Sequence, residues 1–378
     1  MLEFADEHRF DITLKVIGVG GSGGNAVDAL VDSDVPCVDL IAANTDAQAL
    51  GRCRAGQKIQ LGEALTKGWG AGSDPEIGRA AAEESRETIA AALAGADLVF
   101  VACGLGGGTG TGASPLIARI AREQGALVVG AVTKPFLFEG RRRFLQADAG
   151  AKELTDCVDT LITIPNQKLF TLVRQGTPLV DAFRIANNIL LQGIQGITTL
   201  VTMPGLINLD FADIRTIMTK GGDALLGVGS GSGEGRAPEA AAAAVSCPLL
   251  DGEGIGGARR VLLNITGGTD LTLDEVDAVS EVIYRVADHT ANVIFGACVD
   301  SSIRDELRVT LIATGLSRTR PPEQLKLRAA DHDPAHAPTR EAARNTALVR
   351  EILGDGFIED ELDVPTFLRK GRHEAGVK

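Results

Sequence analysis

The sequence is poor in the residues on which several common enzyme mechanisms depend. Only five of its 378 residues are histidine, two near the termini and two in a proline-containing segment. We therefore expect neither a histidine-dependent catalytic triad nor a histidine-bound zinc site. Aromatic residues make up 4% of the chain although 44% is hydrophobic, which predicts cores built from Ala, Val, Leu and Ile.

Long apolar runs and paired cysteines are also lacking. No run approaches the roughly 20 apolar residues of a membrane-spanning helix, and residues 1–11 have no apolar signal-peptide core. Six scattered cysteines form no C-x-x-C pair, which predicts reduced thiols and a cytoplasmic protein. The formal net charge of −13 disfavours nucleic acid and anionic lipid as direct partners, because both repel an acidic protein.

Strand and helix patterns alternate through the first half of the chain. Short apolar runs typical of buried parallel strands predict an α/β fold with a parallel sheet, whose ligands bind at the carboxyl ends of the strands. The expected strands are 12–18, 38–43, 98–103, 127–132 and 160–164, and the expected helices include 26–31, 75–93 and 115–123.

A long helical pattern over residues 178–200 suits a helix that connects two domains. The residues after it predict a smaller α+β domain. Its expected elements are a helix after Asp210, a Gly- and Ser-rich loop at 227–235, helices 238–245 and 273–287, and strands 260–266, 292–298 and 307–313.

The first of two glycine clusters, residues 18–25, follows the first expected strand. It matches G-x-G-x-x-G, and Asp39 lies near the spacing of a ribose-binding acid, so alone it would favour NAD. A tight turn explains one or two of its glycines but not five.

The second glycine cluster, residues 104–112, joins a strand to a helix. Glycine amides at a helix N-terminus form an anion-binding concavity, and threonine hydroxyls add donors. Two such loops on neighbouring strands would hold a polyphosphate from both sides, whereas a dinucleotide fold needs only one. The lysine-based P-loop and the kinase catalytic loop are both absent.

Residues 106–112 match the signature G-G-G-T-G-[ST]-G of the tubulin superfamily at every position. The resemblance covers residues 11–317, resumes in the tail, and is strongest to the FtsZ family of prokaryotic cell-division GTPases. It implies the tubulin/FtsZ-like fold, GTP or GDP with Mg²⁺, and head-to-tail filaments that form the cytokinetic ring at midcell.

The resemblance also implies which residues contact the nucleotide. They lie in the glycine clusters, in the loops near residues 44, 70, 139 and 166, and on the long helix: Gly20, Gly21, Ser22, Gly23, Asn25, Asn44, Asp46, Gly70, Ala71, Gly72, Gly104, Gly106, Gly107, Gly108, Thr109, Gly110, Thr111, Gly112, Pro135, Glu139, Arg143, Asn166, Phe183, Asn187 and Asn188. No protein residue is assigned as a metal ligand.

Some of these residues have simpler interpretations. Glu139 and Arg143 are spaced for a surface ion pair on a helix, and spacing alone favours a core position for Phe183. The family commonly has Asp where this chain has Asn188; an amide offers one acceptor and one donor, so it can still accept from guanine N1–H and donate to O6.

The segment 208–213 resembles the hydrolytic loop of the family, with Asn208, Asp210 and Asp213 as its catalytic residues. The simpler interpretation is a helix N-terminus capped by Asp210. A helix of roughly 20 residues would hold this loop on the order of 30 Å from the nucleotide, at 1.5 Å per residue. The acids would therefore serve the nucleotide of the next subunit in a head-to-tail filament.

The resemblance predicts six segments. They are an extension 1–10, a GTP-binding domain 11–176, a central helix 177–201, a C-terminal domain 202–317, a disordered linker 318–361 and a terminal peptide 362–378. Within the last segment, Leu362–Arg369 would dock onto membrane-tethering and regulatory proteins of cell division. Two alternatives remain: an NAD-dependent oxidoreductase, and a nucleotide-binding scaffold that does not hydrolyse.

Overall fold

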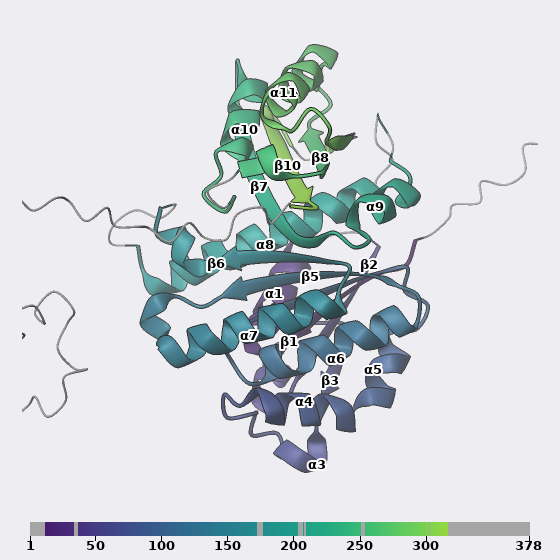
Figure 1. The fold of residues 1–378 in the computed structure, drawn as a ribbon, viewed down its shortest axis with the longest axis vertical. Helices are drawn as coiled ribbons and strands as arrows, with labels where there is room; N and C mark the ends of the chain where they lie inside the picture. The colour runs from purple at the N-terminus through teal and green to yellow at the C-terminus, as the bar shows by residue number, and fades with distance from the viewer. Residues whose placement is uncertain are drawn as a thin grey trace, which may run out of the picture. The chain divides into compact units, whose positions relative to one another are not determined.

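A computed structural model describes residues 12–33, 37–171, 177–202, 207, 209–250, 254–301 and 303–316, all within one compact unit (Figure 1). The extension 1–10, the segment 318–378 and Asn208 lie outside the described residues. Within the described ranges, no helix is long and apolar enough to cross a membrane.

Six parallel strands form the first part of the sheet, in the order β3-β2-β1-β4-β5-β6. They are β1 (Leu14–Val19), β2 (Val38–Asn44), β3 (Gln57–Gln60), β4 (Leu98–Gly104), β5 (Leu127–Lys134) and β6 (Thr160–Pro165). Apolar side chains of β4 alternate between the two faces, so that Phe100 lies in one core and Val101 in the other. This alternation follows from the two-residue repeat of a strand, and it confirms the predicted α/β sheet.

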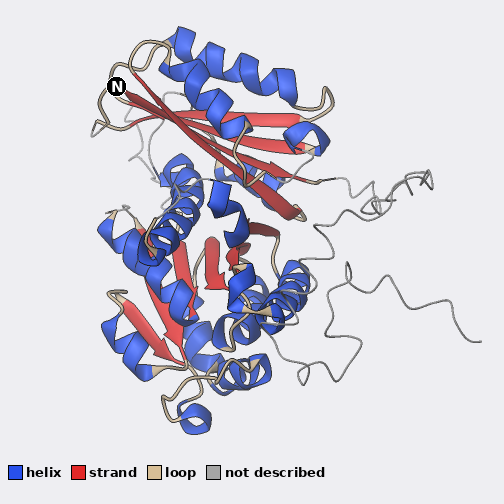
Figure 2. Ribbon diagram, turned by 90° about the vertical axis from the view of Figure 1, so that its left-hand side faces the viewer, coloured by secondary structure: helices blue, strands red, loops and turns tan. Residues whose placement is uncertain are grey.

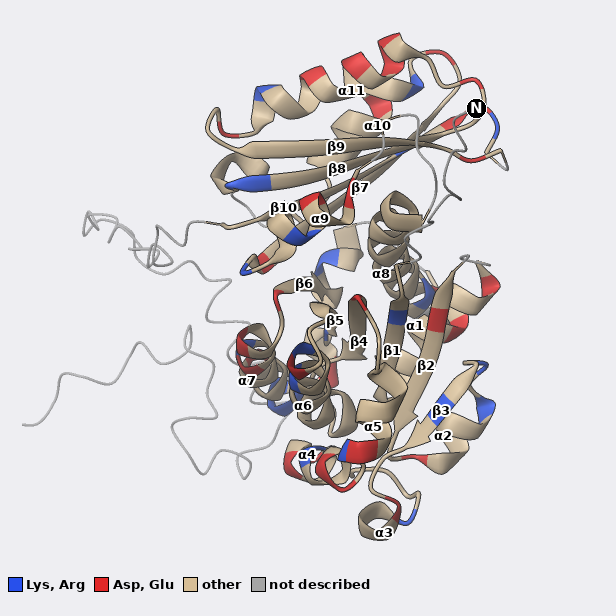
Figure 3. Ribbon diagram, turned by 90° about the vertical axis from the view of Figure 1, so that its right-hand side faces the viewer, with Lys and Arg blue, Asp and Glu red and all other residues tan. Residues whose placement is uncertain are grey.

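Helices cover both faces of the parallel strands (Figure 2). One face packs against α1 (Gly20–Asp32) and α8 (Leu179–Thr202). The other packs against α4 (Pro75–Glu84), α5 (Arg86–Leu93), α6 (Thr109–Glu123) and α7 (Arg141–Cys157). Short helices α2 (Ala47–Arg52) and α3 (Glu63–Thr66) lie near the β3 edge. Figure 3 shows the charged residues mainly on the helices, and β4 carries none.

The remaining strands continue the same sheet. The long strand β7 (Gly222–Ser232) pairs parallel with β6 through residues 222–224 and antiparallel with β10 (Glu306–Thr314) through residues 225–232. Next come β8 (Arg260–Gly267) and β9 (Asn292–Val299), with α9 (Phe211–Met218), α10 (Arg236–Val245) and α11 (Leu273–Val286) packed around them. The side of α8 that turns away from the parallel strands packs against this part.

The expected loop at 227–235 is wrong, because most of it belongs to β7. Gly227, Gly229 and Gly231 alternate along the strand, and a methyl group on any of them would collide with the backbone of α10. The glycines therefore permit a close approach between strand and helix, which is one reason that glycine occurs inside strands.

The prediction of one helix over residues 75–93 is also wrong, because two helices, α4 and α5, cover this range and are separated at Ser85. The Ser85 hydroxyl accepts a hydrogen bond from the Gly62 amide instead of pointing to solvent. Helix α7 was not predicted at all. Its buried positions are mainly small residues, such as Ala147, Gly150 and Ala151, so its apolar face is weak.

A buried arginine joins α10 to α11. Arg236, only 5% exposed, lies 2.6 Å from both Asp270 and Glu275. Its hydrogen bond lowers the pKa of Glu275 to about 2. Glu275 also completes a capping box with Thr272 at the start of α11. One guanidinium thus fixes the positions of two helices.

We expect Arg236→Met to lower the free energy of unfolding by about 3 kcal/mol, because hydrogen bonds to charged groups contribute about 1.5–3 kcal/mol each. The depressed pKa of Glu275 means that its contribution is present above the unfolded value of 4.5 and is lost as pH falls toward 2. Urea unfolding should therefore show that the free energy of unfolding falls less between pH 5 and pH 3 in the variant than in the wild type.

Arg308→Met is the matched control, since its pair with Glu306 is largely exposed and should contribute less than about 1 kcal/mol. Equal destabilisation by the two substitutions would contradict the role assigned to Arg236.

Candidate functional site

A cavity of about 470 Å³ opens where the carboxyl ends of β1, β4 and β5 meet the start of α8. Most of the contact residues expected from the sequence line it: Gly20, Gly21, Ser22, Asn25, Gly104, Gly107, Gly108, Thr109, Gly110, Pro135, Glu139, Arg143, Asn166, Phe183 and Asn187. The ends of parallel strands are where ligands bind in open α/β sheets. The two glycine clusters therefore face a single cavity.

The second glycine cluster presents free backbone donors. No described residue accepts a hydrogen bond from the amides of Gly107 to Thr111, at the start of α6. The first cluster forms the first turn of α1, where a helix also leaves its N–H groups without intrahelical partners. Two helix N-termini with their partial positive charge thus converge on the cavity, an arrangement suited to a polyanion.

Other glycines in these clusters shape the loops rather than line the cavity. A methyl group on Gly112 would collide with the Pro75 carbonyl, and one on Gly106 would lie 2.7 Å from the Arg143 carbonyl. Gly23 packs against Ala102 in the same way. The Thr111 hydroxyl accepts from the Gly106 amide at 2.9 Å, so it holds the loop in shape.

The segment 70–74 packs beside the second cluster. Gly70, Gly72 and Ser73 all have positive φ, and the amides of residues 71–73 donate no hydrogen bond among the described residues. Successive amides in such a conformation form an anion-binding concavity. Ser73 lines the cavity. The sequence reasoning missed this residue, whose left-handed φ of 62° gives no sequence signal in a serine.

Three polar residues, Glu139, Arg143 and Asn166, line the cavity on the side of β5 and β6. Glu139 accepts from the Phe136 amide at 2.9 Å and pairs with Arg143 at 2.6 Å, so the simple ion pair is present and lines the cavity as well. Asn166 is buried, and its Oδ1 has no hydrogen-bond partner among the described residues. An unpaired buried acceptor indicates that a ligand donor is expected there.

Phe183 also lines the cavity and is 37% exposed. It packs edge-on against Phe136, with ring centroids 5.4 Å apart. Asn187 lines the same cavity one turn along α8. Asn188 instead lines a separate cavity of about 610 Å³ with Asn264 and Thr310. Asn187 is therefore the better placed of the two to contact a ligand beside Phe183.

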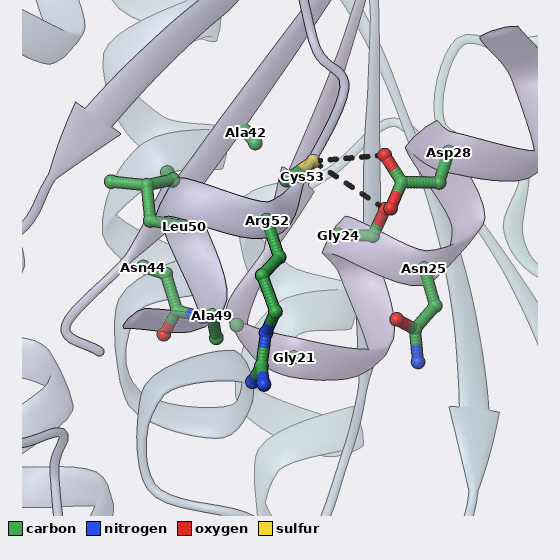
Figure 4. A pocket seen from close by; sticks show the side chains of 12 residues that line it. Gly21, Gly24, Asn25, Asp28, Ala42, Asn44, Ala49, Leu50, Arg52 and Cys53 are labelled. Carbon is green, nitrogen blue, oxygen red and sulfur yellow. Dashed lines mark hydrogen bonds between the residues drawn. The ribbon is translucent and has the colours of Figure 1, made fainter. Parts of the chain in front are cut away.

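Asn44 and Asp46 lie on the far side of the first glycine cluster. Asn44 lines a smaller cavity of about 280 Å³, which shares Gly20, Gly21 and Asn25 with the main one (Figure 4). Asp46 caps α2, with its Oδ1 accepting from two amides. The adjacent Thr45 hydroxyl lies 2.7 Å from that of Thr109, which ties this loop to the second cluster.

Asp39 cannot fill the ribose-binding role of a dinucleotide site. It is the second residue of β2 and pairs with Lys15 at 3.6 Å. The last residue of the strand, Asn44, lies five positions further on, a distance of about 17 Å at 3.3 Å per residue. The geometry disfavours the NAD alternative.

The acids of the 208–213 loop lie away from this cavity. Asp210 occupies the N-cap position of α9 and is exposed, but its side chain makes no capping hydrogen bond. The simple capping interpretation therefore does not explain its carboxylate. Neither Asp210 nor Asp213 lines the cavity. Helix α8, with 24 residues, is about 36 Å long. Its first turns line the cavity, and the two acids follow its C-terminal end in the sequence.

Comparison with known proteins gives consistent matches. The model of the Tubulin/FtsZ family GTPase domain matches residues 13–174, and that of the FtsZ family C-terminal domain matches residues 222–317. An FtsZ dimer from M. jannaschii is 43% identical, covering 80% of this chain and 88% of its own, with a TM-score of 0.77.

Two more distant proteins share the fold. CetZ1 from Haloferax volcanii, described as a GDP-bound monomer, is 23% identical, covers 81% of this chain and 95% of its own, and has a TM-score of 0.71. CetZ2 from the same organism, described as a GTPγS-bound protofilament, is 22% identical, with coverages of 81% and 94% and a TM-score of 0.70.

Proposed function

The chain belongs to the Tubulin/FtsZ family of GTPases, and we propose that it binds GTP in the 470 Å³ cavity and hydrolyses it within head-to-tail filaments. The observation that carries this proposal is the convergence of two helix N-termini with free amides on one cavity. Such a site suits a triphosphate rather than the single pyrophosphate of a dinucleotide.

The base would occupy the end of the cavity beside α8. There the ring of Phe183 can stack on guanine, while the Asn187 amide offers one acceptor and one donor to its edge. The unpaired Oδ1 of Asn166 can accept from a hydroxyl or an amine of the nucleoside. Glu139 and Arg143 would contact the ribose and phosphates.

Mg²⁺ fits the residues present. Among the described residues no three acidic, Cys or His side chains cluster as a metal site, but Mg²⁺ usually takes one or two carboxylates and completes its shell with substrate phosphates and water. Asp46 follows Asn44, which lines the smaller cavity, and it keeps Oδ2 free while Oδ1 caps α2, so it is the carboxylate that would help to hold the ion. The bound ion would neutralise phosphate charge.

Hydrolysis would require the next subunit. Asp210 and Asp213 would orient and polarise the attacking water at the phosphates of a neighbouring chain, because they do not line the cavity of their own. The two ends of the unit are then complementary in function, and their contact is heterologous and repeats into a filament. We extend the proposal to the filament of the division ring at midcell.

The first test is binding. GTP should bind and compete with GDP, whereas NAD should not displace either. A phosphate-release assay separates the hydrolysing filament from a scaffold that only binds nucleotide. Binding of NAD in preference to GTP would overturn the proposal, and GTP binding without phosphate release under assembly conditions would favour the scaffold.

Trp69 should report on the bound nucleotide. It is the only tryptophan of the chain, is 84% exposed, and precedes the 70–74 segment directly. The amides of residues 71–73 donate no hydrogen bond among the described residues, and Ser73 lines the cavity, so we place the terminal phosphate beside this segment. Indole emission should therefore differ between the GTP-bound and GDP-bound forms. Identical spectra with both nucleotides, below and above the concentration of assembly, would contradict it.

The terminal peptide should be dispensable for hydrolysis. Residues 362–378 lie outside the described residues, and in sequence they follow the unit Met1–Ser317, which contains the proposed nucleotide site. Truncation before Leu362 should leave phosphate release within about twofold of the full chain and abolish capture of a membrane-tethering division protein. Loss of hydrolysis in a folded truncated chain would refute this assignment.

A further inference from the structure

Gln146 on α7 contacts the 70–74 segment through an incomplete hydrogen-bond arrangement. Its Nε2 lies 3.4 Å from the Ser73 carbonyl oxygen, longer than the 2.9–3.0 Å of a typical bond. Its Oε1 is buried and has no partner among the described residues. A buried acceptor without a partner is costly, so a further donor is expected to reach it in some state of the protein.

Ser73 joins this contact to the cavity. It lines the cavity, and its carbonyl follows the free amides of residues 71–73. Its left-handed φ of 62° is unfavourable for a serine, so other contacts must hold it there. Gly70 and Gly72, which precede Ser73 in the chain, also have positive φ, and as glycines they leave the backbone of the segment free to change conformation. The Gln146 amide therefore contacts the residue of the segment whose backbone conformation depends most on contacts with its surroundings.

Helix α7 contacts both the second glycine cluster and the 70–74 segment. Arg143, three residues before Gln146, lines the cavity, and its carbonyl packs against Gly106 of the second glycine cluster. Gly150, one turn after Gln146, packs against the Thr111 methyl group. Residues three or four apart lie on one side of a helix, so a single face of α7 touches both loops.

We propose that Gln146 is a positioning residue that orients the 70–74 segment toward the terminal phosphate and thereby favours GTP over GDP. This inference rests on the proposed nucleotide site. A terminal phosphate draws the free amides of the segment toward it, and that movement shortens the bond to the Ser73 carbonyl and brings a donor to Oε1. Only the triphosphate gains these contacts, and a ligand shifts a conformation only through such differential affinity.

The test compares GDP with a non-hydrolysable GTP analogue in the full chain. Gln146→Met should weaken the analogue about five- to tenfold, the range of one net hydrogen bond, and change GDP affinity less than twofold. The Trp69 emission difference between the two nucleotides should shrink in parallel. Gln146→Glu keeps the acceptor but loses the donor to Ser73, so it should also lower the ratio of analogue affinity to GDP affinity. It takes the place of the methionine variant if that variant folds poorly.

Gln124→Met is the matched control, because Gln124 also donates from Nε2 to a backbone carbonyl, that of Ala90, at 2.8 Å, but does not line the cavity. It should leave the ratio unchanged. Equal losses for both nucleotides, or no loss for either, would overturn the inference. Failure of the wild type to bind GTP would instead contradict the proposed function.

Discussion

Asp210→Ala should lower GTP hydrolysis by about 100-fold or more while leaving GTP binding within about twofold. A positioned acid or base typically contributes 10²–10⁴ in rate, and Asp210 does not line the cavity that would hold the nucleotide. Its side chain makes no capping hydrogen bond, so α9 should tolerate alanine well. The measurements are phosphate release under assembly conditions and equilibrium binding of labelled GTP.

Glu87→Ala controls for the loss of an exposed carboxylate near a helix N-terminus, since Glu87 lies in the first turn of α5 and Asp210 lies at the N-cap of α9. It should change hydrolysis little, because its only shared property with Asp210 is the interaction with a helix dipole. A loss of GTP affinity in Asp210→Ala equal to its loss of rate would place this acid in the binding site instead.

Gly107→Val should lose GTP affinity by about 100-fold or more. Gly107 lines the cavity, and a Cβ there meets no protein atom within 4 Å, so the side chain would occupy ligand space without disturbing the fold. Blocking two charge-assisted hydrogen bonds from the loop amides, at about 1.5–3 kcal/mol each, accounts for a loss of this size. Gly108 is a poorer choice, because a methyl group there would lie 2.8 Å from Ala71.

Gly257→Val is the control for this substitution. Gly257 also has open space around a Cβ but does not line the cavity. Thermal unfolding of both variants should match the wild type. Retention of wild-type GTP affinity by folded Gly107→Val would remove the second glycine cluster from the nucleotide site.

The sequence patterns predicted the buried strands well, because β1, β4 and β5 are mostly apolar, as is typical of strands buried between two layers of helices. The long connecting helix was equally clear from its periodicity. Both features follow from the spacing of apolar side chains, which can be read directly from the sequence. Tubulin/FtsZ membership also followed from the second glycine cluster, and the family matches confirm it.

Elements built from small residues could not be recognised in the same way. Glycines in β7 indicated a loop, although they serve the close approach of α10, which lies several residues further along the chain. The weak apolar face of α7 hid a helix that contacts the second glycine cluster and the 70–74 segment. Ser73 was missed since backbone conformation, and not side-chain chemistry, brings it to the cavity. In each case the decisive contact depends on packing between segments.

If one active site combines residues of two chains, two variants that are inactive alone should complement each other when mixed. Asp210→Ala binds GTP without hydrolysing it in our account, and Gly107→Val keeps its acids but does not hold the nucleotide. When the two are combined, subunits of the first kind present GTP to the loop of the second, so phosphate release should recover to a substantial fraction of the wild-type rate. Recovery should rise with total protein concentration. If the mixture stays inactive although the two variants demonstrably co-assemble, catalysis across the subunit contact is contradicted.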